Sequence, residues 1–179
     1  MQFSKNTLLR FQIFSVIFTW ILGTILHFTY DLSNPKAIVG AFSAINESTW
    51  EHLKLLFFPM LITTIIGYFI KGKEIPNYLC SKVLGIIFSM CFIVIFFYTY
   101  TGIMGTNFAI IDISSFFIAV ILGQYISYKK MKSMNSCNII IPIITLLILY
   151  FCFLIFTFAP PHIALFKDPL TGMFGIFHN

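Results

Sequence analysis

The stretch NESTWEHLKL, from Asn46 to Leu55, gathers two glutamates, a histidine and a lysine within eight positions. The surrounding chain is apolar: only 9% of its 179 residues are charged and 59% are hydrophobic. Imidazole nitrogens and carboxylate oxygens are ligands that zinc accepts, and histidine also titrates near neutral pH. This concentration of ionisable groups marks a candidate site.

Other parts of the chain supply further groups of the same types. A divalent cation such as zinc, with an open position for water, would support a metal-dependent hydrolase or transferase. No H-E-x-x-H spacing occurs, so such a site must be assembled from several helices. The candidate metal ligands are His27, His52 and His162, and the candidate catalytic carboxylates are Glu51, Asp112 and Asp168.

The same stretch also has the features of a helix start. Ser48 and Glu51 have the spacing of a capping box, in which each side chain satisfies a free backbone N–H of the first turn. Glu51 and Lys54 form an i, i+3 pair that can neutralise its charges. His52 is not needed for the cap, and it lies about 100° around the helix from Glu51. It is therefore free to point into a bundle.

The elements that must position these groups are membrane-spanning helices. The mean hydropathy of +0.93 and the 23 phenylalanines exceed what soluble domains carry. A spanning helix needs about 20 mostly apolar residues, and backbone groups in lipid must be paired internally. We predict an all-α, polytopic bundle in the cell membrane, formed by 1–179 as a single domain. The expected spans are 8–28, 50–70, 83–101, 107–128 and 138–159.

Basic residues indicate the orientation, because they favour cytoplasmic linkers. Eight of the eleven fall before the first span or in the linkers after the second and fourth spans. The amino terminus is therefore predicted to be cytoplasmic and the carboxyl terminus external. This places the candidate site residues at the outer face. It also explains the net charge of +5 without nucleic acid, and leaves the lipid bilayer and a small-molecule or lipid ligand at the outer face as the expected partners.

Two other segments are apolar but not expected to span. Residues 37–45 are about half the length needed, so they should form a surface or re-entrant segment. Pro160 and Pro161 should end the fifth helix, and the apolar tail 160–179 should pack back over the outer mouth of the bundle. Cys80 and Cys137 lie on the predicted cytoplasmic side, so no disulfide is expected.

Three motifs extend the interpretation to the whole chain. They are H-F-x-Y at 27–30, N-E-S-x-W-E-H-x-K at 46–54 and P-P-H-x-x-L-F-x-D-P at 160–169. In these motifs the chain resembles a family of small, functionally uncharacterised bacterial integral-membrane proteins. The resemblance implies the fold and topology but assigns no chemistry.

Two alternatives to an enzyme stay open on the sequence. In the first, an outward-open pocket binds or transports a small solute or proton, with Asp112 carrying the coupling charge. No ionisable residue is predicted in the inner half of a span, which argues against a path across. In the second, the polar groups only hold helix ends together in a structural membrane protein.

Overall fold

The computed structural model describes residues 5–133 and 135–176, and this part of the chain is helical without a strand. Within these described residues, five helices are long and apolar enough to cross a membrane. The prediction of an all-α bundle with five such helices is confirmed. The long helices are α1 (Lys5–Leu32), α3 (Thr49–Ile70), α4 (Tyr78–Met104), α5 (Ala109–Met131) and α6 (Ile140–Phe158); the short ones are α2 (Ala37–Gly40), η1 (Gly72–Glu74) and η2 (Ala164–Phe166).

Local signals account for several helix boundaries. α3 starts after Ser48, whose hydroxyl accepts a hydrogen bond from the Glu51 N–H at 3.4 Å. α4 stops at Gly105, which has a left-handed φ of 74° and donates its N–H to the Thr101 carbonyl at 2.8 Å. α6 ends just before Pro160 and Pro161, which lack the N–H that a helix would need.

α3 is the most buried of the five long helices; α1 and α4 pack along it, and aromatic side chains of α6 contact it. Leu56 and Phe57 are fully buried in its middle, against Ile86 of α4 and Phe153 of α6. The outward faces of the other helices carry exposed isoleucines and phenylalanines. Apolar residues on the outside and a dense core inside suit a bundle whose solvent is lipid.

The helices approach closely where one of them lacks a side chain. A carbon added at Gly23 of α1 would lie 2.6 Å from the Leu55 carbonyl oxygen of α3. Pro59 follows Leu55 by four residues and has no N–H to bond that carbonyl. Glycine therefore lets α1 lie directly against the α3 backbone, one turn away from His27.

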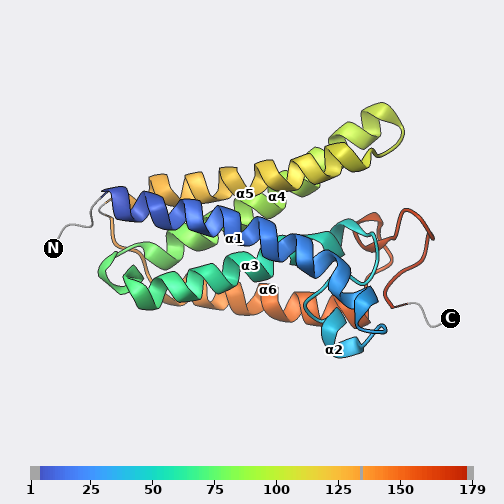
Figure 1. The fold of residues 1–179 in the computed structure, drawn as a ribbon, viewed down its shortest axis with the longest axis horizontal. Coiled ribbons are helices and arrows are strands. Elements are labelled where there is room, and N and C mark those ends of the chain that lie inside the picture. Colours follow the sequence, from blue (N-terminus) through green and yellow to red (C-terminus); the bar gives the residue numbers. More distant parts are fainter. Residues whose placement is uncertain (1–4, 134, 177–179) are drawn as a thin grey trace.

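The chain enters α1 at one end of the bundle and leaves α6 at the other (Figure 1). We call the end where α1 and α6 finish and α3 begins the site end, and the opposite end the lysine end. At the site end, α2 folds over the helices, and the tail beyond α6 returns to the bundle. Phe166 of this tail is buried against Trp50, with ring centroids 4.9 Å apart.

Two expectations about the lysine end were wrong. Lys82 precedes the predicted span 83–101 and was therefore expected in the linker before it, among the eight cytoplasmic basic residues. It lies inside α4, where it is buried and donates hydrogen bonds to Gln12 (2.8 Å) and Gln124 (2.9 Å). The prediction that no ionisable residue lies in the inner half of a span therefore fails for Lys82, which is within α4 at the lysine end. Linear hydropathy could not locate it, because the two glutamines that solvate it come from α1 and α5.

The second correction concerns Cys80 and Cys137, which form a disulfide with their Cα atoms 6.5 Å apart. The bond joins the first turn of α4 to the segment before α6. Sequence reasoning excluded it on the predicted compartment alone. The fold brings the two cysteines together because α6 starts beside the beginning of α4.

Candidate metal site

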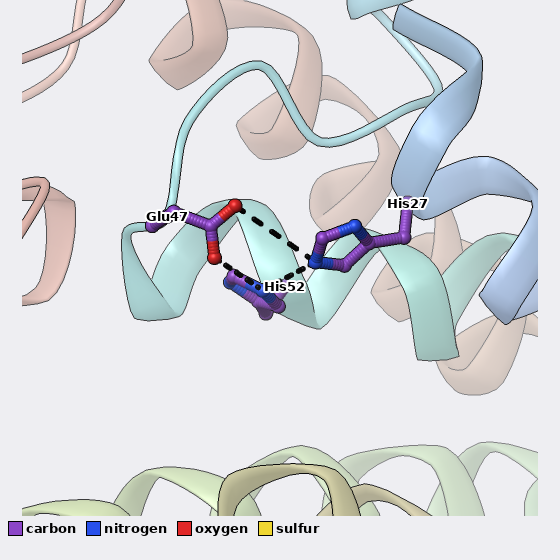
Figure 2. Close-up of side chains that lie close together, drawn as sticks. All are labelled: His27, Glu47 and His52. Carbon is purple, nitrogen blue, oxygen red and sulfur yellow. Dashed lines mark hydrogen bonds and ion pairs between the residues drawn. The ribbon is translucent and has the colours of Figure 1, made fainter. Parts of the chain in front are cut away.

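The site end brings two histidines and one glutamate to a single point (Figure 2). His27 lies near the end of α1, Glu47 in the loop before α3, and His52 in the first turn of α3. The Nε2 atoms of His27 and His52 are 3.3 Å apart. One Glu47 oxygen, Oε2, lies 3.4 Å from His52 Nε2, and the other, Oε1, lies 3.9 Å from His27 Nε2. All three side chains are only partly buried.

The start of α3 fixes the orientation of His52. Its Nδ1 lies 3.0 Å from the Ser48 carbonyl oxygen, which can only accept, so Nδ1 carries the proton. The lone pair is therefore on Nε2, which faces His27 and Glu47. A backbone carbonyl that holds the far nitrogen of a histidine is the usual support of a metal ligand.

The loop that carries Glu47 is held on both sides. Asn46 accepts a hydrogen bond from the Ser48 N–H at 3.0 Å and donates one to the Gly175 carbonyl at 3.1 Å. The tail after α6 thereby supports the loop. The motif at 46–54 works as a unit in which Asn46 and Ser48 shape the loop, and Glu47 and His52 supply donor atoms.

The spacing of the three donors fits a cation. Two ligands about 2.05 Å from a tetrahedral zinc ion are about 3.3 Å apart. The 3.3 Å between the two Nε2 atoms and the 3.4 Å between His52 Nε2 and Glu47 Oε2 match this separation. The 3.9 Å contact of His27 is with the other oxygen, Oε1, so the half-exposed carboxylate would have to turn to place one oxygen near both imidazoles. His27 Nδ1 is buried and has no hydrogen-bond partner within the described residues. The three groups form one side of a coordination shell and leave its other side open.

That open side faces a cavity of about 520 Å³ between α1, α3, α4 and α5. Figure 1 shows the turn between α4 and α5 projecting away from the other helices at this end. His27, Glu47 and His52 line the cavity together with Asp112, and the apolar Pro169 and Leu170 of the tail also reach it. A pocket of this size is within the range that binds small molecules, about 300–1,000 Å³.

Asp112 is in the same cavity but outside the three-residue group. Its carboxylate accepts hydrogen bonds from the Tyr100 hydroxyl and from Asn107, at 3.3 Å for the latter. Tyr100 lies on α4 and Asp112 on α5. The aspartate therefore ties the two helices together beside the cavity, while its position leaves it available to a bound molecule.

Glu51 occupies a different environment from the one predicted for a catalytic group. It is 2% exposed, forms an ion pair with Lys54, and accepts hydrogen bonds from the Ile45 N–H (3.1 Å) and the Thr157 hydroxyl (3.3 Å). Lys54 also donates to the Gly40 carbonyl at 2.7 Å. The pair connects α3 with α2 and α6. Glu51 does not complete the capping box, because Ser48 N–H is bonded to Asn46 instead.

The predicted residues of the tail lie apart from the donor group. His162 is exposed, and its ring centroid is 4.6 Å from that of Phe174. Asp168 accepts hydrogen bonds from the Leu170 N–H (2.8 Å) and the Thr171 hydroxyl (3.0 Å), which closes the local turn. His52 is therefore paired with His27 and not, as expected, with His162.

Glu47 is the site residue that sequence reasoning did not select. Its signal was its place in the acidic stretch, four positions from Glu51, where two carboxylates on one helix face would repel. The structure avoids this repulsion, because α3 starts at Thr49 and leaves Glu47 in the loop. The two carboxylates then point to different partners.

The fold and composition define a multi-pass helical membrane protein with a polar group at one end of the bundle. The chain belongs to a family of unknown function, DUF6512, whose model matches residues 1–176. The expectation that the chain belongs to a family without an assigned function is therefore confirmed. Comparison with curated proteins gave no match, and comparison with solved structures gave none either.

Proposed function

We propose that the chain is a metal-dependent membrane enzyme, a hydrolase or transferase, in which His27, Glu47 and His52 hold a divalent cation such as zinc. One observation carries this proposal: two imidazole Nε2 atoms and a carboxylate converge on one point at the wall of a cavity. Two histidines and a glutamate are a ligand set that hydrolytic zinc enzymes use.

A cation at this point would lower the pKa of a bound water to about 7 and polarise a carbonyl or phosphoryl oxygen. Water, or the hydroxyl of a second substrate, would add to the substrate and give up a proton, and the leaving group would depart with a proton. Asp112 is the proposed proton-transfer group because it lines the same cavity. Glu51 and Asp168 are not proposed, since neither side chain lines this cavity and both are buried and hydrogen-bonded to other parts of the chain.

The test is the metal content of protein purified in detergent without a metal-affinity step. We expect about one divalent cation per chain, and His27→Ala and His52→Ala should each abolish it. Glu47→Gln should weaken metal affinity by more than about tenfold, because even supporting groups of a metal site contribute that much. Chelator competition measures the affinity.

His162→Ala is the matched control, since it removes the same side chain from the same end of the bundle. It should leave metal content unchanged. Wild-type protein that takes up no zinc, manganese or iron after dialysis against each would overturn the proposal. Equal loss of metal in His162→Ala and His52→Ala would do the same.

A second candidate function, transport, is favoured by Lys82. This ammonium lies buried at the lysine end, where glutamine oxygens of α1 and α5 accept its hydrogen bonds. Polar groups at membrane depth are typical of solute and proton pathways. Flux of protons or solute in proteoliposomes that Lys82→Met abolishes, with metal content unchanged, would favour transport over hydrolysis.

A further inference from the structure

The cavity at the metal group changes character with depth. Its polar lining is near the site end, where the candidate ligands lie beside Thr49, Asn107 and Asp112. The remaining wall is almost wholly apolar. It is formed by Gly23, Phe28, Leu55, Ile93, Phe97, Ile113, Phe116 and Phe117. Thr24 and Ser115 also line it, but their hydroxyls already donate hydrogen bonds to the Trp20 and Asp112 carbonyls.

Helix geometry gives the depth of the apolar wall. At about 1.5 Å per residue, Phe116 lies about 10 Å from the start of α5, and Ile93 about 16 Å from the end of α4. Leu55 lies about 9 Å inside α3 on the same scale. In helices that cross a membrane, these positions are within the hydrocarbon layer, which is about 30 Å thick.

The cavity also has a side that faces the bundle surface. Phe28 of α1 and Ile113 of α5 both line the cavity, yet they are 55% and 58% exposed. A molecule in the surrounding lipid could therefore enter between α1 and α5 without crossing water. Water is a poor occupant of the deep part, because it would find few polar partners there.

We infer that the cavity binds an amphiphile with one hydrocarbon chain, the chain lying against α4 and α5 and the polar head lying at His27, Glu47 and His52. The inference names the substrate class of the proposed enzyme and rests on that proposal for the role of the head. The volume of about 520 Å³ is of the size that takes one small ligand.

A photoreactive fatty acid with a diazirine in mid-chain is the probe. The protein is reconstituted in nanodiscs of saturated phospholipid, irradiated with the probe, digested and analysed by mass spectrometry. We expect labels within 93–97 and 113–117. An excess of an unlabelled long-chain acid should prevent labelling, whereas acetate should not.

Two tryptophan substitutions block the cavity from opposite walls. Ile113→Trp on α5 and Thr24→Trp on α1 both enlarge lining side chains, and each should reduce labelling by about fivefold or more. Ile110→Trp and Ile21→Trp are the matched controls. They lie one turn away on the same helices, are 76% and 58% exposed, and are not part of the lining, so labelling should persist.

The outcomes separate the two proposals. Metal that is bound at full occupancy without chain-specific labelling would overturn the amphiphile and leave the metal site standing. Labelling that both blocking variants remove, in protein that takes up no metal, would uphold the amphiphile and overturn the enzyme. Labelling of the controls and the blocked variants to the same extent would show only surrounding lipid and would overturn the inference.

Discussion

At the scale of single residues, the ionisable groups of the 46–54 motif divide into two sets. Glu47 and His52 are partly exposed and face the cavity, whereas Glu51 and Lys54 are buried and bonded to each other. A buried ion pair contributes little net stability, but a charge left without its partner is costly. The two glutamates should therefore respond differently to the same change.

Glu51→Gln should destabilise the folded protein by about 3–5 kcal/mol, because it leaves the Lys54 ammonium buried without a countercharge. Replacing both, as in Glu51→Gln with Lys54→Met, should recover much of that loss. Thermal unfolding in detergent measures the effect, with Glu47→Gln as the control that stays close to wild type. A Glu51→Gln protein of unchanged stability and lost activity would instead return Glu51 to the catalytic role first predicted for it.

At the scale of elements, the metal group depends on the contact between α1 and α3. His27 comes from α1, and the two other donors come from α3 and the loop before it. The absence of a side chain at Gly23 lets these two helices touch. A Cβ atom added there would also lie 2.8 Å from the Phe116 ring. The position of one ligand relative to the others is therefore set by a residue that binds nothing.

Gly23→Ala should weaken metal affinity by about tenfold, because it pushes α1 away from α3 and misplaces His27. Gly102→Ala is the control, since a carbon added there meets nothing within 4 Å. Chelator competition gives the affinities, and the unfolding temperature shows whether the bundle remains folded. Equal affinities in the two variants would show that α1 adjusts without moving the ligand.

At the scale of the whole molecule, the charge distribution and the disulfide indicate opposite orientations of the lysine end in the membrane. Five lysines, at 71, 73, 129, 130 and 132, lie at the lysine end, and basic linkers favour the cytoplasm. The bond between Cys80 and Cys137 lies at the same end, and such bonds persist mainly in oxidising compartments. Because several lysines act together in setting topology, we predict that the lysine end is cytoplasmic.

A reporter fused after Ser133 should therefore report cytoplasm. In a Cys91→Ser, Cys152→Ser background, a membrane-permeant maleimide should label Cys80 and Cys137 only after a reductant has opened the disulfide that joins them. An external reporter would reverse the predicted orientation, and labelling without reductant would show that the disulfide does not form in the cell.

The sequence by itself determined the helical class, the five apolar segments and the start of α3. These features depend on neighbours in the chain: runs of apolar residues, the Ser48 cap and the two prolines after α6. It also identified His27 and His52 as candidate ligands, because imidazole is a ligand that zinc accepts and both were predicted at the same end of the bundle. Local patterns could not show that His52 meets His27 and lies apart from His162.

Only the tertiary structure decided which polar groups meet. His52 and His27 are 25 positions apart, Lys82 and Gln12 are 70 apart, and the cysteines of the disulfide are 57 apart. Such contacts depend on how each helix is rotated and how closely it packs, and in lipid this is decided by side-chain packing and interhelical hydrogen bonds. The glycine that lets α1 contact α3, and the loop that separates Glu47 from Glu51, assemble the candidate site from parts that no short stretch contains.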